Sequence, residues 1–352
     1  MDVIRRDVVT VAQLDAFDEV IDARSPAEFA LDHVPGAINC PVLDDAERAR
    51  VGTLYKEASP FDAKKLGAAM VSKNIARHIE ERFRGHPREW RPLVYCWRGG
   101  KRSAAMAHVL REIGWNAVTL EGGYRAYRRD VVAQLEALPG RFRFRVVCGA
   151  TGSGKSRLLE ALAAGGAQAL DLERLACHRG SLLGDLPGAA QPSQKMFDSG
   201  VCAELRQLDP AWPVFVEAES KKIGQLQVPT PLLDRMREGE CLRLEVPPAE
   251  RVRFLIGEYR HFLEEPAALE EKLRCLTSFY GHAVIGRWIA HAEAGAWEAL
   301  VADLLVNHYD PAYLRATARN YLHYDESRPL RIARLDATGI ERAAAELMNP
   351  SA

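Results

Sequence analysis

The stretch Val146-Val147-Cys148-Gly149-Ala150-Thr151-Gly152-Ser153-Gly154-Lys155-Ser156 decides the fold of the second half of this chain. An apolar run leads into a G-x-x-x-x-G-K-[ST] loop, and residues 157–164 continue with helical spacing. In a strand–loop–helix context the amides of such a loop surround a phosphate group, the lysine balances its charge and the last hydroxyl can ligate Mg²⁺. The sequence therefore predicts an α/β domain that binds a phosphate group.

The residues predicted to hold a diphosphate are Gly149, Thr151, Gly152, Ser153, Gly154, Lys155 and Ser156. The strand predicted over residues 213–219 carries Glu217 and Glu219 where such domains usually place a metal-binding aspartate. Ser156 and Glu217 are candidate Mg²⁺ ligands, and we expect no tightly bound cofactor. No pattern indicates adenine recognition, so the loop predicts a phosphate ligand and not ATP in particular.

A second glycine-rich loop, Tyr95-Cys96-Trp97-Arg98-Gly99-Gly100-Lys101-Arg102-Ser103, precedes the first in the chain. It follows an apolar run and leads into helical spacing that ends at Gly114. Oriented amides, a helix N-terminus and nearby cations favour a thiolate over a thiol, so Cys96 is the candidate nucleophile. The predicted anion site around it consists of Arg98, Gly99, Gly100, Lys101 and Arg102.

The composition limits the classes of protein to which the chain can belong. At 352 residues, with 47% hydrophobic and 27% charged residues, the chain is long enough for two globular domains. No apolar stretch reaches membrane length, and residues 1–7 lack the apolar core of a signal peptide. Seven cysteines without a C-x-x-C pair favour neither a disulfide framework nor a zinc site, so we expect a reducing cytoplasm.

The pattern along the chain predicts two domains. Strand–helix alternation over the first 130 or so residues indicates a mostly parallel α/β sheet. Residues 138–140 form the best linker candidate, so the predicted domains are residues 1–138, with the Cys96 loop, and residues 141–352, with the phosphate loop. From Pro248 onward the pattern is largely helical.

Arginine and phenylalanine alternate just after the linker. On a strand this spacing would place Arg141, Arg143 and Arg145 on one face, opposite Phe142 and Phe144. The net charge of −1 provides no global attraction for a polyanion. A nucleic-acid partner would therefore need a local basic patch, to which this arginine face could contribute.

The first domain resembles the rhodanese family. The segments that carry the resemblance are Asp22-Ala23-Arg24-Ser25-Pro26-Ala27-Glu28-Phe29, His33-Val34-Pro35-Gly36-Ala37-Ile38-Asn39 and Glu121-Gly122-Gly123-Tyr124. One difference is that the loop runs C-x5-R from Cys96 to Arg102, one residue longer than the common sulfurtransferase loop. This length is shared with rhodanese-fold phosphatases and leaves room for a larger tetrahedral oxyanion.

A rhodanese-like domain followed by a P-loop NTPase-like α/β domain with a helical C-terminal region is similar to the tRNA 2-selenouridine synthase family. Besides the two loops, the matching segments are His178-Arg179-Gly180-Ser181, Gln191-Pro192-Ser193-Gln194 and Glu219-Ser220-Lys221-Lys222-Ile223-Gly224. The resemblance covers nearly the whole chain, and it rests on the order and spacing of these segments.

The resemblance implies a transferase that acts on wobble 2-thiouridine of tRNA in two stages. Geranyl diphosphate alkylates the sulfur, and selenium from selenophosphate then replaces the S-geranyl group. Cys96 would carry selenium as an S-selanylcysteine, and the phosphate loop would hold the diphosphate. The implied partners are a tRNA with wobble 2-thiouridine and a supplier of selenophosphate, without a membrane.

Four further residues are predicted to contact tRNA phosphates or the diphosphate: His178, Arg179, Lys221 and Lys222. Ordinary surface or helix-cap chemistry would explain them equally well. Two alternatives for the whole chain also stay open. One is a rhodanese-linked small-molecule kinase or phosphatase with ATP on the phosphate loop, and the other is a non-catalytic tRNA-binding regulator.

Overall fold

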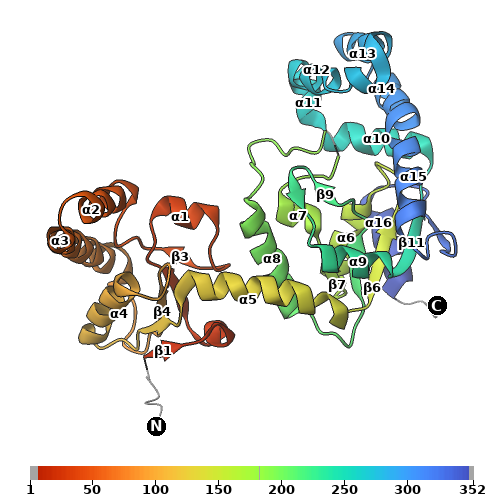
Figure 1. The fold of residues 1–352 in the computed structure, drawn as a ribbon. Helices are drawn as coiled ribbons and strands as arrows, with labels where there is room; N and C mark the ends of the chain where they lie inside the picture. Colours follow the sequence, from red (N-terminus) through yellow and green to blue (C-terminus); the bar gives the residue numbers. More distant parts are fainter. Residues whose placement is uncertain (1–6, 182, 349–352) are drawn as a thin grey trace. The chain divides into compact units, whose positions relative to one another are not determined.

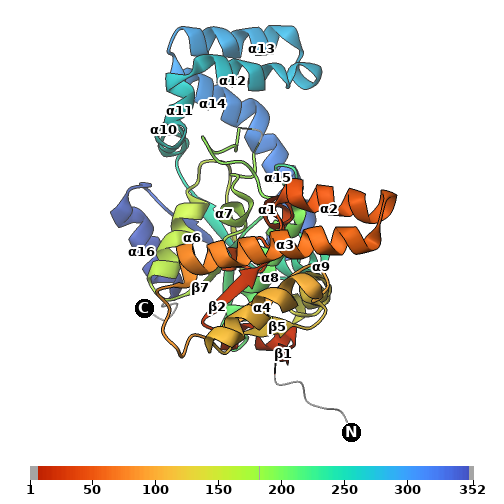
Figure 2. The same ribbon diagram turned by 90° about the vertical axis from the view of Figure 1, so that its left-hand side faces the viewer.

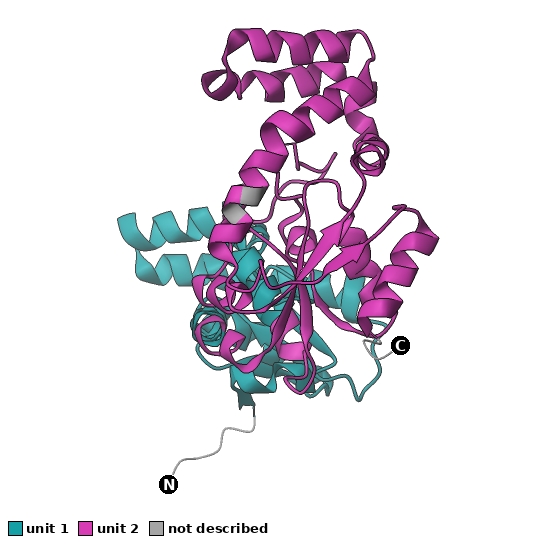
Figure 3. Ribbon diagram, turned by 90° about the vertical axis from the view of Figure 1, so that its right-hand side faces the viewer, with its two compact units in different colours: residues 1–134, 193–203 teal, residues 135–192, 204–352 magenta. Residues whose placement is uncertain are grey.

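The computed structural model describes residues 7–181 and 183–348 of the chain. They form two compact units, residues 1–134 with 193–203 (unit 1) and residues 135–192 with 204–352 (unit 2), which are coloured separately in Figure 3. Each unit is built on a five-stranded parallel sheet, as the strand–helix alternation predicts. The expectation that no signal peptide is present concerns residues that lie, except for Asp7, outside the described ones.

The sheet of unit 1 has the strand order β1-β5-β4-β2-β3. Its strands are β1 (Val8–Val9), β2 (Glu19–Asp22), β3 (Ile38–Asn39), β4 (Pro92–Tyr95) and β5 (Val118–Leu120). β4 lies at the centre, and all its residues are buried. A strand covered on both faces is expected to be continuously apolar, and this is why the Cys96 loop follows an uninterrupted apolar run.

The helices of unit 1 surround this sheet. They are η1 (Val11–Ala16), α1 (Pro26–Leu31), α2 (Asp45–Glu57), α3 (Pro60–His78), η2 (Ile79–Phe83), α4 (Lys101–Ile113) and α5 (Gly123–Ala137). α2 and α3 lie side by side as an antiparallel pair (Figure 2). The Asp44 side chain caps α2 by accepting a hydrogen bond from the amide of Glu47 at 2.7 Å. α4 ends at Gly114 with φ 109°, as the glycine pattern predicts.

A segment from later in the chain completes unit 1. Residues 193–203, which include the first part of α8 (Gln194–Gln207), belong to this unit. Arg128 of α5 donates a hydrogen bond to the carbonyl of Lys195 at 3.0 Å and forms an ion pair with Asp198. No sequence pattern indicated this return, because it depends on contacts between residues far apart in the chain.

The sheet of unit 2 has the strand order β12-β11-β6-β8-β7. Its strands are β6 (Phe144–Cys148), β7 (Gln168–Leu170), β8 (Val214–Glu217), β11 (Glu240–Glu245) and β12 (Pro329–Arg331), and a separate hairpin pairs β9 (Lys222–Ile223) with β10 (Leu226–Gln227). β6 is central and leads into the phosphate loop, and β8 beside it ends at Glu217. The ends of β6 and β8 therefore place the phosphate loop and Glu217 at the same edge of the sheet.

Two groups of helices belong to unit 2. Those beside the sheet are η3 (Pro139–Arg141), α6 (Lys155–Ala164), α7 (Leu172–Ala176), α9 (Thr230–Arg237) and α16 (Ala337–Met348). The others are α10 (Pro248–Glu258), α11 (Arg260–Glu264), α12 (Pro266–Arg274), α13 (Thr277–Glu293), α14 (Trp297–Leu304), η4 (Leu305–Tyr309) and α15 (Asp310–Asn320). Helices α10 to α14 form the cyan and blue group of Figure 1, which has its own apolar core around Trp288.

One prediction from the sequence differs from the structure. The strand predicted from Arg141 begins only at Phe144, because Pro139 initiates a turn of 3-10 helix that includes Arg141. The two phenylalanines are buried as predicted, but the arginines do not form a strand face, and Arg145 is paired with Glu240 at 3.0 Å.

The prediction of a largely helical region after Pro248 is confirmed, and one short strand, β12, also returns to the sheet there. This strand has three residues, of which only Leu330 is buried, so its sequence is too short to show the apolar–polar alternation that predicts a strand. Among the described residues, no helix combines the length and apolar character needed to cross a membrane.

Candidate active sites in the two units

The Cys96 loop packs against the glycine pair Gly122–Gly123 at the start of α5. The carbonyl of Cys96 accepts a hydrogen bond from the amide of Tyr124 at 2.9 Å, and the carbonyl of Trp97 accepts one from Arg125 at 3.1 Å. A β-carbon at Gly123 would lie 2.1 Å from the Cys96 carbonyl oxygen. Only glycine permits this approach, and it explains the segment Glu121–Tyr124 that resembles the rhodanese family.

The sulfur of Cys96 lies at the start of α4. Its side chain is almost covered, with 3% of the residue exposed. The hydroxyl of Ser103 lies 3.2 Å from Cys96 Sγ and 3.2 Å from the Gly100 carbonyl oxygen, so it can donate to either. Gly100 is the N-cap of the helix, and the free amides of the first turn favour negative charge nearby. The predicted nucleophile therefore lies beside the free amides at the start of α4.

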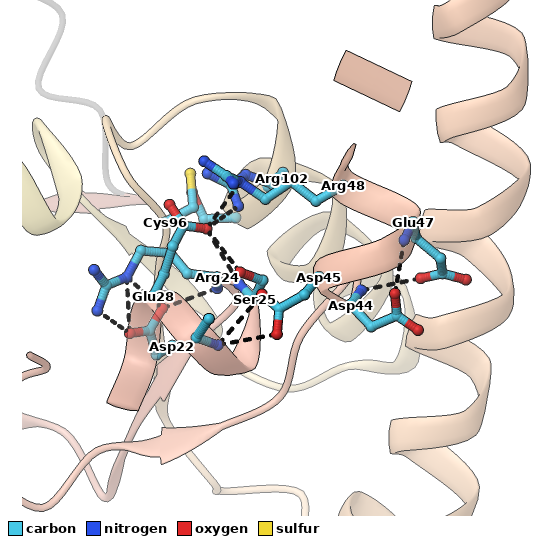
Figure 4. A network of polar contacts seen from close by, with 12 residues as sticks. Asp22, Arg24, Ser25, Glu28, Asp44, Asp45, Glu47, Arg48, Cys96 and Arg102 are labelled. Carbon is cyan, nitrogen blue, oxygen red and sulfur yellow. Dashed lines mark hydrogen bonds and ion pairs between the residues drawn. The ribbon is translucent and has the colours of Figure 1, made fainter. Parts of the chain in front are cut away.

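The cations of the predicted anion site differ in their availability. Arg102 donates to Glu28 at 3.0 Å, and Arg48 contacts the same carboxylate at 3.2 Å, as Figure 4 shows beside Cys96. Burial opposes ionisation of Glu28, but the hydrogen bond and charge of Arg102 outweigh it and lower the pKa of this carboxyl. Arg98 and Lys101 are exposed. Arg102 is thus held by Glu28, while Arg98 and Lys101 are the cations open to an incoming anion.

The phosphate loop joins β6 to α6 and has the shape that the motif predicts. Gly152 and Gly154 both have φ of 78°, a conformation that favours glycine. Lys155 Nζ donates to the carbonyl of Gly149 at 3.0 Å. The amide of Gly149 donates to the hydroxyl of Tyr313 at 2.5 Å, and Arg251 donates to the carbonyl of Thr151 at 2.9 Å. The loop is therefore held from outside by residues of α10 and α15, which the motif does not include.

Three carboxylates converge beside this loop. Carboxylate oxygens of Glu173 in α7, Glu217 at the end of β8 and Glu219 lie within 4.8 Å of one another, and Ser156 Oγ donates to Glu173 at 3.3 Å. Burial, together with the charge of Glu217, raises the pKa of Glu173 to about 8, against the opposing charge of Lys155. Burial also raises the pKa values of Glu217 and Glu219.

This cluster fits a hard divalent cation. One oxygen of Glu217 is buried without a hydrogen-bond partner among the described residues, and carboxylate and hydroxyl oxygens are the ligands that Mg²⁺ prefers. The sequence proposed Ser156 and Glu217 as ligands, and the structure adds Glu173. Glu173 was missed because an acid in a five-residue helix gives no signal until the fold brings it to the end of β8.

The phosphate loop and the three acids line a cavity of about 900 Å³ in unit 2. His178 and Arg179 also line it. His178 lies 3.3 Å from Asp185, and Arg179 is paired with Glu258 at 3.1 Å and lies over the ring of Tyr259. These two residues of the predicted tRNA or diphosphate set are therefore next to the phosphate site.

The other two residues of that set, Lys221 and Lys222, do not line this cavity. Both are exposed, at the start of the β9–β10 hairpin. The hairpin is tied down by Gln191, which donates to the carbonyl of Ile223 at 3.0 Å and accepts from the amide of Gln225 at 2.8 Å. The structure thus gives Gln191 a structural role and leaves the two lysines free to contact solvent.

An apolar pocket adjoins the phosphate cavity. Five residues line both: Thr151, Ser181, Leu255, Tyr259 and Tyr309. The rest of its wall is apolar and comes from the loop before α8 and from helices α10, α11, α12, α14 and η4, with Leu183, Phe262, Trp297, Leu300 and Val301 among its residues. The sequence predicts helices in this region but not that their apolar side chains lie beside the phosphate loop.

The remaining cysteines do not share the setting of Cys96. The hydrogen bond with Cys241 and burial raise the pKa of the Cys148 thiol, and burial raises that of Cys40. Cys177 is partly exposed and has a left-handed backbone with φ of 49°. None of these lies on a glycine-rich cationic loop, so Cys96 stays the candidate nucleophile.

Fold and sites together define a class of protein in which a rhodanese-like unit with a cysteine loop precedes a P-loop unit. Residues 10–130 match the family model of the rhodanese-like domain. Residues 142–282 match the family model described as the tRNA 2-selenouridine synthase AAA domain.

Three curated proteins named tRNA 2-selenouridine synthase illustrate the similarity. The one from Alcanivorax borkumensis is 35% identical over 72% of this chain and 71% of its own. The one from Nitrosomonas europaea is 34% identical over 72% of this chain and 66% of its own, slightly under two thirds. The one from Bdellovibrio bacteriovorus is 29% identical over 86% of this chain and 90% of its own. The chain belongs to the tRNA 2-selenouridine synthase family.

Proposed function

We propose that the protein converts wobble 2-thiouridine in tRNA to 2-selenouridine, in two steps that use the two loops separately. Geranyl diphosphate first alkylates the sulfur, and selenium derived from selenophosphate then replaces the alkylated sulfur. The support comes from family membership together with the two sites, a cysteine in an anion-favouring loop and a phosphate loop beside an apolar pocket.

The first step suits unit 2. The bond between C1 of the geranyl group and the diphosphate oxygen breaks, a bond from sulfur to C1 forms, and the uridine loses its N3 proton. Negative charge grows on the leaving diphosphate, and preorganised amides and cations stabilise such charge most where water is excluded. The amides of residues 152–155 and the ammonium of Lys155 are the groups that would receive it.

The observation that carries this assignment is that the apolar pocket lies next to the phosphate cavity and shares five lining residues with it. A nucleotide would present a polar sugar and base to the wall beyond the phosphates, whereas a geranyl group presents only hydrocarbon. The wall beyond Leu255 and Tyr259 is built from leucine, valine, phenylalanine and tryptophan side chains. Burying hydrocarbon there is favourable by roughly 25 cal/mol per Å².

The second step suits unit 1. A thiocarbonyl sulfur is a poor leaving group, but the alkylated sulfur leaves as geranyl thiol when selenium adds at C2. Cys96 would carry the selenium: its thiolate attacks the selenium of selenophosphate, a sulfur–selenium bond forms, the selenium–phosphorus bond breaks and phosphite leaves. Once selenium is bonded to C2, an added thiol would supply the two electrons that break the sulfur–selenium bond. The open cations Arg98 and Lys101 would attract the selenophosphate oxyanion. Ser103 would orient the sulfur.

A Mg²⁺ ion would be held by Ser156, Glu173 and Glu217, and it would supply positive charge to the diphosphate oxygens. The residues of the chain account for binding without it, through the loop amides and Lys155. Cytoplasmic conditions would keep the free cysteines of the chain reduced.

The experiment that tests the proposal uses the purified protein, a tRNA with wobble 2-thiouridine, geranyl diphosphate and selenophosphate, followed by nucleoside mass spectrometry. We expect S-geranyl-2-thiouridine when selenophosphate is omitted and 2-selenouridine when it is present, both without ATP. An absolute requirement for ATP, or no change in the nucleoside, would contradict the proposal.

A binding measurement tests the apolar pocket directly. Val301→Thr keeps the shape of the side chain but adds a hydroxyl to the pocket wall. We expect it to weaken binding of geranyl diphosphate by about 1–2 kcal/mol and to leave inorganic diphosphate unaffected. Val306→Thr, the same change at a residue that is 65% exposed, is the control. Equal affinity of the unaltered protein for geranyl diphosphate and inorganic diphosphate would show that the pocket does not bind the geranyl group.

A further inference from the structure

Asp32 is a buried carboxylate that the proposed chemistry does not use. It follows α1 and is completely covered. One oxygen accepts a hydrogen bond from the hydroxyl of Tyr124 at 2.7 Å, and the other accepts one from the hydroxyl of Ser199 at 2.8 Å. No cation among the residues that the structure describes forms an ion pair with it, so these two hydroxyls carry much of its stabilisation.

Tyr124 links this carboxylate to the Cys96 loop. Its hydroxyl binds Asp32, its backbone amide binds the carbonyl of Cys96 at 2.9 Å, and its ring stacks on Trp97 with centroids 5.2 Å apart. The guanidinium of Arg24 covers the ring at 4.0 Å and also donates to the carbonyl of Asp32 at 2.6 Å. Burial and the hydrogen bond to Asp32 raise the pKa of Tyr124, so the hydroxyl stays a donor.

Ser199 comes from the segment that returns to unit 1 after the phosphate loop. The residue is 1% exposed and lies in α8. The segment is held independently at two other points, by the hydroxyl of Ser193 on the carbonyl of Leu31 and by the ion pair of Arg128 with Asp198. The contact of Ser199 with Asp32 is therefore not required merely to keep the segment in place.

We propose that Asp32, Tyr124 and Ser199 act together as positioning residues for Cys96. Asp32 accepts hydrogen bonds from both hydroxyls at once. The one from Tyr124 holds that residue so that its backbone amide binds the Cys96 carbonyl. The Cys96 sulfur is thereby kept next to the Ser103 hydroxyl. The carbonyl carbon and the side chain of Cys96 are both bonded to its α-carbon, so we expect a shift of the Tyr124 amide to move the sulfur. This inference rests on the proposed function only in assigning selenium transfer to Cys96.

Two properties distinguish this arrangement from ordinary core packing. Both hydroxyls act through one carboxylate, so removing either leaves an oxygen of Asp32 buried without its partner. Removing the second hydroxyl then adds little, because the geometry is already lost. Residues that act as a unit are expected to be non-additive in a double-mutant cycle.

The experiment measures the rate at which iodoacetamide alkylates Cys96 in the full-length protein, followed on the Cys96 peptide by mass spectrometry. Ser199→Ala and Tyr124→Phe are each expected to raise this rate about threefold to tenfold, because a loosened loop exposes the nearly covered sulfur. The double variant should be no faster than the faster single variant. Asp198→Asn, which loosens the same segment without contacting Asp32, should change the rate less than twofold.

A second readout separates positioning from stability. In the two single variants selenium exchange on pre-geranylated tRNA should slow by about threefold to tenfold through kcat, with geranyl transfer unchanged. Additive effects of the two substitutions, an unchanged alkylation rate, or an equal effect of Asp198→Asn would each overturn the inference. The alkylation rate needs no substrate, so it tests the positioning of Cys96 even where 2-selenouridine proves not to be the product.

Discussion

The Cys96 loop and the phosphate loop are built from the same local parts and differ in what surrounds them. Each follows a central buried strand, contains glycine with positive φ (Gly99 in one loop, Gly152 and Gly154 in the other) and leads into a helix that begins with lysine, Lys101 in α4 and Lys155 in α6. The Cys96 loop is covered by the Gly122–Gly123 turn, and the polar contacts of its buried sulfur are with Ser103 and the Gly100 carbonyl. The phosphate loop opens instead into a cavity of about 900 Å³.

The two loops therefore share a backbone arrangement but lie in different surroundings. Tight backbone contacts enclose the Cys96 loop, and its sulfur is nearly covered. The acids, tyrosines and apolar pocket beside the phosphate loop suit a ligand with a charged head and a long body. The predictions below ask whether the two loops can be disabled separately.

The largest effect is expected from Cys96→Ser. An alcohol cannot form the link to selenium, so 2-selenouridine should fall to background while the fold and tRNA binding persist. S-geranyl-2-thiouridine should accumulate, because the phosphate loop is untouched. Nucleoside mass spectrometry measures both products. Normal 2-selenouridine in the variant would exclude a covalent role for Cys96.

The next effect is expected from Lys155→Ala. By analogy with removal of one preorganised donor from an anion site, geranyl transfer should lose about 2–4 kcal/mol of transition-state stabilisation. Selenium exchange on pre-geranylated tRNA should be affected less, since its leaving group is a thiol. Single-turnover rates of the two steps provide the comparison. Equal damage to both steps would mean that the loop holds a different ligand.

A smaller effect concerns tRNA binding outside both loops. Reversing the charge of Lys221 and Lys222 should weaken tRNA binding about tenfold and reduce the slope of log affinity against log salt, because fewer counterions are released. The same change at Lys64 and Lys65, which are exposed on α3, is the control. An equal loss in both variants would indicate a general effect of charge and not a contact at the hairpin.

The smallest effect is a change in thermal stability with pH. The pKa of Glu173 is raised from 4.5 to about 8. The folded protein therefore retains a proton that the unfolded chain releases, and stability should fall as pH rises from about 4.5 to about 8. Glu173→Gln should flatten part of this dependence in metal-free buffer, and Mg²⁺ should raise the melting temperature of the unaltered protein more at pH 8 than at pH 6. Identical slopes for both proteins would exclude Glu173 as the titrating group.

Much of this architecture was readable from the sequence because the signals are local. The apolar strand Pro92–Tyr95 before the Cys96 loop, the helix that ends at Gly114, and the phosphate loop between a strand and a helix all lie where their patterns predict. Each depends on a few adjacent residues whose backbone preferences agree with the final fold. The rhodanese-like and P-loop order of the two units followed from the same motifs.

What the sequence did not indicate depends on contacts between distant segments. Glu173 joins Glu217 and Glu219 only once β7 and β8 pair, and Ser199 reaches Asp32 across more than a hundred residues of chain. The ion pair of Arg102 with Glu28 and the apolar pocket beside the phosphate loop also depend on contacts between distant segments. Site residues were thus predictable where one loop supplies them and not where several elements converge.

The most direct test that the two loops serve separate steps is a crossed assay of the two loop variants by nucleoside mass spectrometry. Cys96→Ser and Lys155→Ala are each given 2-thiouridine tRNA and, separately, tRNA that is already S-geranylated. We predict that Cys96→Ser forms S-geranyl-2-thiouridine from the first tRNA but no 2-selenouridine from either, whereas Lys155→Ala forms 2-selenouridine readily only from the second. Failure of both variants at the same step would contradict the account.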